Sequence, residues 1–203
     1  MKKLIISILL GLGISLTASP VQAMITLGFE PVEQVVPLGQ SVDVDITISG
    51  LGDFAPDSLG TFDLDVGFDP DILDFSAVTF GDPILGDQLD LLGFGSFTSV
   101  TPGVGVVNLF ELSLDFPGDL DTFQPGAFSL VTLTFDTKSI GTSPLELAVN
   151  SLGDAFGFLL AGTVESGKVD VVPEPGTFLL MGVGLAGMAG LRRRRLSKKR
   201  EDT

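Results

Sequence analysis

The chain contains no cysteine, histidine, tryptophan or tyrosine among its 203 residues. These absences exclude disulfide bridges, Ser–His triads, cysteine nucleophiles and zinc sites built from His or Cys. They leave carboxylate pairs as candidate catalytic groups, as in glycoside hydrolysis. Because Asp and Glu together number 26, close pairs of carboxylates arise by chance. We therefore expect a protein that is not an enzyme.

Basic residues are scarce between positions 24 and 172. This stretch carries 23 acidic residues and two basic ones, Lys138 and Lys168, which gives a net charge of −21. So strong a negative charge keeps a domain soluble through self-repulsion. Nucleic acids and anionic lipid headgroups are not expected as partners, because binding to either requires positive charge on the protein.

The N-terminus has the three-part pattern of an export signal. Lys2 and Lys3 are followed by an apolar run over residues 4–16 and by small residues that end at Ala23. This order predicts a signal peptide over residues 1–23, cleaved between Ala23 and Met24. A retained N-terminal anchor is the alternative. Cleavage would leave residues 24–172 as one domain of ordinary size outside the inner membrane.

The C-terminus combines three further signals. Pro173, Glu174 and Pro175 form an extended break, because proline fixes φ and removes a backbone donor. Residues 177–191 are apolar and uncharged, which predicts a transmembrane helix. A basic block then stops the helix and places the chain end in the cytoplasm by the positive-inside rule: Arg192, Arg193, Arg194 and Arg195.

This order of triplet, apolar helix and arginine block resembles the PEP-CTERM sorting signal of exopolysaccharide-producing Gram-negative bacteria. The same motif is also labelled an ice-binding protein C-terminal motif. The resemblance, over residues 173–203, implies that an exosortase-type membrane protease cuts near the triplet and releases or transfers the domain. We then expect the chain in the inner membrane during sorting and afterwards at the outer surface or outside the cell. A plain C-terminal anchor is the alternative.

Residues 24–172 alternate between apolar and polar side chains, which indicates β-strands with one wet face. The clearest examples are 41–49 (SVDVDITIS) and 61–69 (TFDLDVGFD). Along 104–116, one face collects Val106, Phe110, Leu112, Leu114 and Phe116, and Asn108 interrupts it. Further strands are expected at 25–29, 73–80, 127–136, 145–149, 156–160 and 167–172. With Pro and Gly at the joins and no helical period, we predict an all-β, jelly-roll-like sandwich of about eight or nine strands.

The order of these strands resembles a cohesin-type domain. Residues 35–42 (VVPLGQSV) are similar to the family's lead-in, and 61–75 is similar to its Tyr-Asp-Pro turn with Phe68 in place of Tyr. Residues 130–135 and 166–171 are similar to its late strands. The resemblance implies a nine-strand sandwich that binds dockerin domains and shares a fold superfamily with some carbohydrate-binding modules.

Residues 81–103 depart most from that pattern. Their apolar side chains do not alternate cleanly: Leu85, Leu89, Leu91, Leu92, Phe94 and Phe97. We expect a loop that packs over the sandwich, because most such residues are buried. An exposed apolar patch that binds a partner is the alternative.

Acidic residues at two turns are candidates for calcium, which prefers several carboxylate and carbonyl oxygens together. The first set is Asp69, Asp71 and Asp74, and the second is Asp115, Asp119 and Asp121. Neither has the spacing of an EF-hand loop. We therefore expect these acids to form turns, with no dedicated metal site or other cofactor.

Two binding functions remain. Carbohydrate sites use flat aromatic platforms, usually Trp or Tyr, whereas only Phe is present here and we place most Phe on the inward register. We therefore predict a non-catalytic module of the cell surface or extracellular matrix that binds a protein, for example a dockerin-like one, through a cohesin-like face. An exopolysaccharide-binding matrix protein is the alternative. Protein binding predicts an apolar patch on one sheet face, and sugar binding predicts a groove with exposed Phe.

Overall fold

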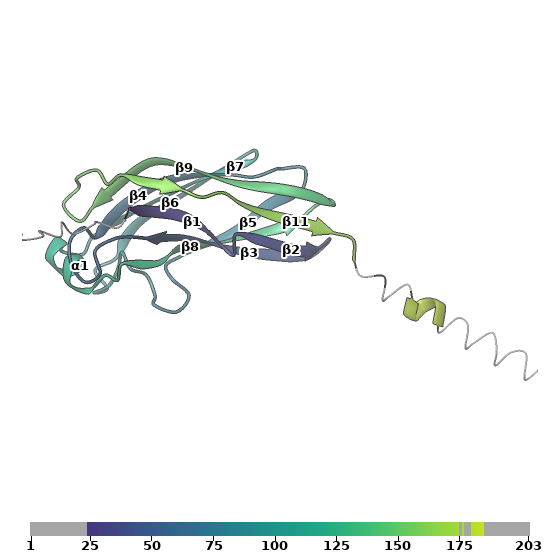
Figure 1. Cartoon of the computed structure of the whole chain (residues 1–203), viewed down its shortest axis with the longest axis horizontal. Helices are drawn as coiled ribbons and strands as arrows, with labels where there is room; N and C mark the ends of the chain where they lie inside the picture. Colours follow the sequence, from purple (N-terminus) through teal and green to yellow (C-terminus); the bar gives the residue numbers. More distant parts are fainter. Residues whose placement is uncertain (1–23, 175, 177–179, 185–203) are drawn as a thin grey trace, which may run out of the picture.

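The computed structural model describes residues 24–174, 176 and 180–184, and shows two β-sheets packed face to face (Figure 1). Within these residues the sandwich contains eleven strands and one short helix. Their bounds are β1 (Ile25–Glu30), β2 (Glu33–Pro37), β3 (Ser41–Ser49), β4 (Leu59–Gly67), β5 (Leu73–Phe80), β6 (Ser96–Gly103), β7 (Val106–Ser113), α1 (Pro117–Phe123), β8 (Ala127–Thr137), β9 (Gly141–Asp154), β10 (Gly162–Val164) and β11 (Gly167–Val172).

Sheet A has the strand order β10-β1-β3-β8-β5, and sheet B has the order β2-β11-β9-β4-β7-β6. Neighbouring strands are antiparallel except for the pairs β1–β10 and β2–β11, which are parallel. Every connection between consecutive strands passes from one sheet to the other, except the one between β6 and β7, which are neighbours in sheet B. The two sheets are therefore joined by nearly all of the loops.

The predicted all-β sandwich is confirmed, but eleven strands replace the eight or nine expected. Two extra strands, β2 and β6, lie at the edges of sheet B. Both have little apolar alternation because an edge strand buries few side chains, so their sequences gave no strand signal. The strand expected at 156–160 is wrong: these residues form a loop, and the short β10 follows it.

Alternating side chains of both sheets fill the core. Phe135 on β8 is fully buried and contacts Phe68 and Phe75, with ring centroids 5.1 and 6.2 Å apart. Phe62 and Leu64 on β4 are also fully buried. Burial of this kind contributes roughly 1.5–3 kcal/mol for each large apolar side chain. With no disulfide in the chain, this core is the main source of stability.

Residues 81–103 do not form the packed loop that we expected. Leu89 is buried, but a majority of the six apolar side chains are exposed: Leu85, Leu92, Phe94 and Phe97. The segment divides into a loop over residues 81–95 and the edge strand β6. Helix α1 was also not predicted, and it buries one side chain, Leu120. Pro117 begins this helix, where its missing N–H costs nothing.

Several predicted features lie outside the described residues. These are the signal peptide at 1–23, Pro175 and the arginine block at 192–195. Most of the predicted transmembrane helix also lies there, although residues 180–184 are described and helical. Within the part of the chain that the structure describes, no helix has the length and apolarity needed to cross a bilayer.

Candidate binding surfaces

The outer face of sheet A is polar. Asp43 and Asp45 on β3 accept hydrogen bonds from the hydroxyls of Thr134 and Thr132 on β8. The hydroxyl of Ser41 likewise donates to Asp136. Pairs of this kind between opposite positions of neighbouring strands stabilise the sheet and leave both groups in water. This face therefore matches the solvated acidic face that the alternation predicted.

A hollow of about 410 Å³ opens beside this face, at the end of β5. Its lining combines carboxylates, threonines and one half-buried ring: Asp43, Asp45, Thr79, Phe80, Gly81, Asp82, Pro83 and Thr132. Burial opposes ionisation of Asp82, but hydrogen bonds from the N–H groups of Ser129, Leu85 and Ile84 hold its pKa below the ordinary value. Asp82 is thus an ionised loop anchor rather than a proton donor.

The outer face of sheet B is different, because an apolar stripe lies along β7 and β6. Val106, Phe110 and Leu112 of β7 point outward, while Val107 and Leu109 between them are fully buried. On the edge strand β6, Phe97 lies directly opposite Leu112, so both side chains share the outer face. Phe97 is 61% exposed and Leu112 is 39% exposed. The apolar set predicted along 104–116 therefore faces solvent.

An amide and carboxylate cluster borders this stripe on β4. The Nδ2 group of Asn108 donates to Asp63 Oδ1 at 2.6 Å and to Asp65 Oδ1 at 2.8 Å. Asn150 on β9 donates to the same oxygen of Asp63 at 3.2 Å. These bonds hold the carboxylates in place on a rigid sheet. The face thus presents apolar contact area beside fixed hydrogen-bond acceptors.

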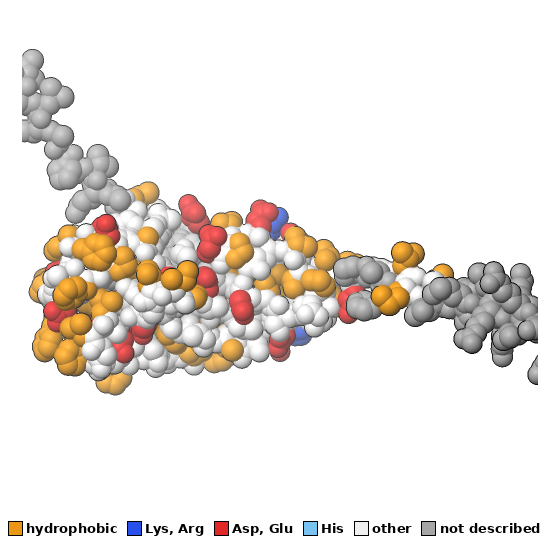
Figure 2. Space-filling view, turned by 90° about the horizontal axis from the view of Figure 1, so that it is seen from below, with side chains coloured by type: hydrophobic (Ala, Val, Ile, Leu, Met, Phe, Trp, Pro, Cys, Tyr) orange, Lys and Arg blue, Asp and Glu red, His pale blue; other side chains and the backbone are white. Residues whose placement is uncertain are grey.

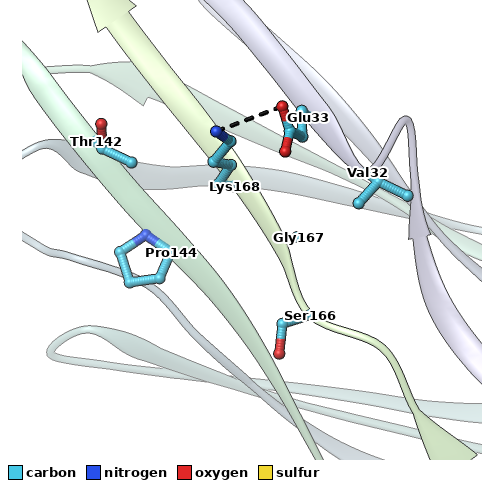
Figure 3. A pocket seen from close by; sticks show the side chains of 7 residues that line it. All are labelled: Val32, Glu33, Thr142, Pro144, Ser166, Gly167 and Lys168. Atoms are coloured by element: carbon cyan, nitrogen blue, oxygen red, sulfur yellow. Dashed lines mark ion pairs between the residues drawn. The ribbon is translucent and has the colours of Figure 1, made fainter.

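A smaller hollow of about 270 Å³ lies beside Lys168 (Figure 3). Lys168 Nζ lies 3.3 Å from Glu33 Oε2 and 3.6 Å from Asp170 Oδ2. Hydrogen bonding to Glu33 and the charges of both acids raise the pKa of Lys168 above its ordinary value. An ammonium group held in this way joins β11 to β2 and is not a nucleophile or a general base.

Two buried carboxyl groups lie under the loop of residues 81–95. Glu111 on β7 is fully buried, and its Oε1 accepts a hydrogen bond from the hydroxyl of Ser96 at 2.6 Å, whereas its Oε2 has no partner. Burial, together with the nearby charges of Asp87 and Asp90, raises the pKa of Glu111 to about 8. Asp115 is also buried, with one oxygen unpartnered. The sequence analysis missed Glu111, although its alternation with the apolar residues Val107 and Leu109 could have marked it as a carboxyl group on an otherwise apolar face.

Of the acids considered for calcium, Asp69 stabilises a turn as expected, whereas Asp74 lies on β5 and Asp119 and Asp121 lie on α1. Asp69 Oδ1 accepts a hydrogen bond from the N–H of Asp71, while Asp74 lies on β5 opposite Asp136 of β8. Asp121 accepts a bond from Ser58, and Asp115 accepts one from the N–H of Leu92. No group of three or more Asp, Glu, His or Cys residues in the described ranges is arranged to hold a metal ion.

We expected most phenylalanines to face inward, but nearly half of those that the structure describes are exposed. Seven of the fifteen described phenylalanines are exposed: Phe54, Phe94, Phe97, Phe116, Phe123, Phe156 and Phe158. Five of these seven lie in loops and Phe123 ends helix α1, where strand alternation gives no information about burial. Phe97 lies on an edge strand. No exposed phenylalanine is among the residues that line either hollow described above.

Comparison with known proteins supports both resemblances. Residues 171–195 match the PEP-CTERM protein-sorting motif, which implies export and sorting to the cell surface. No curated protein sequence matches the chain. The sandwich is similar in structure to a non-cellulosomal cohesin of the archaeon Archaeoglobus fulgidus, with 18% identity, a TM-score of 0.55, and coverage of 77% of this chain and 96% of that one.

Two further cohesins give similar values. The cohesin in a type I cohesin–dockerin complex from Clostridium thermocellum has 13% identity and a TM-score of 0.57, covering 73% of this chain and 99% of that one. A cohesin module of a Clostridium perfringens family 33 glycoside hydrolase has 13% identity and a TM-score of 0.56, covering 75% and 99%. The fold is therefore cohesin-like.

Proposed function

We propose that the chain is an exported, non-catalytic module of the cell surface or extracellular matrix that binds a protein through the outer face of sheet B. The observation that carries this proposal is the contrast between the two outer faces. Sheet A presents carboxylates already paired with hydroxyls, whereas sheet B presents the stripe of Phe97, Phe110 and Leu112. Exposed apolar area with a polar border is typical of protein–protein interfaces.

The geometry of this face suits a folded partner. The stripe lies on the paired strands β6 and β7 rather than on loops, so little conformational entropy is lost when a partner binds. The carboxylates of Asp63 and Asp65 are held by Asn108 and offer acceptors of fixed direction. A similar fold binds a dockerin in the Clostridium thermocellum complex, which supports a dockerin-like partner here.

A cross-linking experiment tests the face directly. When a photo-reactive phenylalanine analogue replaces Leu112 in the producing cells, we expect irradiation to link the chain to a protein partner. The same analogue at Thr134, on the outer face of sheet A, is the matched control and should give no product. With the partner identified, Leu112→Asp should weaken binding by about 2 kcal/mol or more, the cost of disrupting an interface hot spot. Products from Thr134 alone would contradict the proposal.

The domain organisation forms part of the same proposal. Residues 1–23 are a cleaved signal peptide, 24–172 are the binding domain, and 173–203 are a sorting signal with a transmembrane helix. Intact mass of the protein from culture supernatant and from membranes tests this arrangement. We expect a released form that begins at Met24 and ends near Pro173–Gly176, because an exosortase cuts near the triplet. A mass that retains residues 177–203, found only in the inner membrane, would instead show a plain anchored domain.

Exopolysaccharide binding is the second candidate, and the exposed phenylalanines favour it, because aromatic rings can stack on sugar rings. The hollow beside sheet A, however, contains one half-buried ring, Phe80, among carboxylates. Retention of the protein by purified host exopolysaccharide, unchanged by Leu112→Asp, would favour this candidate over protein binding.

A further inference from the structure

The loops at one end of the sandwich form a second apolar surface, separate from the face of sheet B. Four loops meet there, at residues 50–58, 81–95, 114–126 and 155–161, and we call this surface the loop tip. β11 ends at the opposite end of the sandwich (Figure 1). Figure 2 shows hydrophobic side chains gathered over the loop tip.

Buried polar groups hold these loops together. The side chain of Gln124 is almost fully buried, accepts a hydrogen bond from the N–H of Leu59 and donates to the carbonyls of Leu59 and Gln88. This amide joins the loops at 81–95 and 114–126 to the first residue of β4, and the backbone carbonyl of Gln124 accepts a hydrogen bond from the N–H of Phe54 in the loop at 50–58. Asp154 Oδ1 orders the fourth loop by accepting from the N–H groups of Phe156 and Phe158. The loop tip is therefore a preorganised surface.

Several apolar side chains of the loop tip, most of them phenylalanines, point into solvent. Phe116 is 66% exposed and Phe158 is 71% exposed. Phe94 and Phe116 contact each other edge to face, with ring centroids 5.7 Å apart, although both are exposed. The exposed rings of Phe54 and Phe123 belong to two different loops, and the hydrogen bond from the Phe54 N–H to the carbonyl of Gln124 joins these loops. The loop tip therefore holds several exposed aromatic rings on loops that are already ordered, as is typical of interaction sites.

The charge of the loop tip has one sign. The four loops contain no Lys or Arg and eight Asp residues, of which all but the buried Asp115 reach the surface at least in part: Asp53, Asp57, Asp82, Asp87, Asp90, Asp115, Asp119 and Asp121. The only basic residues of positions 24–172, Lys138 and Lys168, lie elsewhere, on the turn before β9 and on β11. A complementary partner therefore combines apolar side chains with positive charge.

We propose that the loop tip binds a cationic amphipathic segment of a protein, in which Lys or Arg flank an apolar helix face. Apolar side chains of such a segment would cover the exposed phenylalanines, and its basic residues would meet the loop carboxylates. A second copy of the domain at residues 24–172 fits less well, because this domain carries a net charge of −21 and has no basic residue at the loop tip. Anionic lipid is disfavoured by the same charge.

The test uses the full chain in nanodiscs of neutral phosphatidylcholine and a fluorescent peptide of Leu and Arg, about 18 residues long and arranged as an amphipathic helix of five turns. Fluorescence anisotropy measures binding. A peptide of the same composition in scrambled order is the first control. We expect the amphipathic peptide to bind at least about tenfold more tightly than the scrambled one, and salt to weaken its binding.

Variants locate the binding site. Phe116→Ser together with Phe158→Ser should reduce peptide binding at least about tenfold, because both rings are exposed contact area. Val35→Ser together with Ile140→Ser removes similarly exposed side chains, 69% and 56%, away from the loop tip and should leave binding unchanged. Leu112→Asp should also leave it unchanged, so failure of this proposal is distinguishable from failure of the sheet B proposal.

Three results would overturn the assignment. Equal binding of the scrambled peptide would show attraction by charge alone. Concentration-dependent self-association that the loop-tip variant abolishes would show that a second copy is the occupant. Adsorption of the chain to added lipid vesicles, lost in the same variant, would show that the occupant is a membrane.

Discussion

Replacing Glu111 by glutamine is expected to remove much of the pH dependence of folding stability between about pH 4.5 and about pH 8. Glu111 is buried, and its pKa is raised from 4.5 to about 8 in the folded protein. Between these two values the folded state keeps a proton that the unfolded state loses. Stability therefore falls as pH rises through this window, by about 1.4 kcal/mol per pH unit for one group, and is unaffected by this group below it.

Urea denaturation at pH 5 and at pH 8 measures this effect. We expect Glu111→Gln to have near wild-type stability at pH 5 and to exceed the wild type at pH 8 by several times RT, because the neutral amide has no charge to bury. Glu146→Gln, at an exposed position of β9, removes the same charge from the surface and is the control. An equal gain in both variants would attribute the effect to the overall negative charge instead.

Replacing Gln124 by leucine should destabilise the protein by about 3 kcal/mol or more. The substitution is similar in volume but removes three hydrogen bonds and leaves the N–H and C=O of Leu59 and the C=O of Gln88 without this partner. Each unsatisfied buried group costs about 1–3 kcal/mol. The loss should also reduce peptide binding at the loop tip, because loops that are no longer joined must be ordered when the peptide binds.

Gln40→Leu is the matched control for this prediction, because Gln40 lies in an exposed turn at the other end of the sandwich. Its free energy of unfolding should change by less than about 0.5 kcal/mol. A similarly small change in Gln124→Leu would show that water or loop movement replaces the lost bonds, and the description of the loop tip as preorganised would then be wrong.

Local patterns were sufficient to predict most of the sandwich. The strand over 41–49 was predicted with its observed bounds, because its alternation of Val or Ile with Asp or Thr matches a half-buried strand. The sorting motif was also identified from its residues, since its three parts are contiguous in the chain. Edge strands β2 and β6 and helix α1 were missed, because pairing and packing with distant segments maintain them.

The candidate surfaces could not be predicted to the same extent. Alternation along 104–116 groups Val106, Phe110 and Leu112 on one face, but it does not say whether that face points inward. The fold buries Val107, Leu109 and Glu111. The other set, Val106, Phe110 and Leu112, therefore lies on the outer face that we propose as the binding surface. The loop tip was missed for a related reason, since its phenylalanines come from four loops that are far apart in the sequence.

For this chain, composition and local order are enough to establish an acidic, cysteine-free β-domain with export and sorting signals, because these properties depend on residues that are neighbours in the sequence. Which apolar side chains are buried and which remain available to a partner depends on how the strands pair and how the loops meet. That choice is a property of the tertiary structure, because a period of two in a strand defines two faces but does not assign either one to the core.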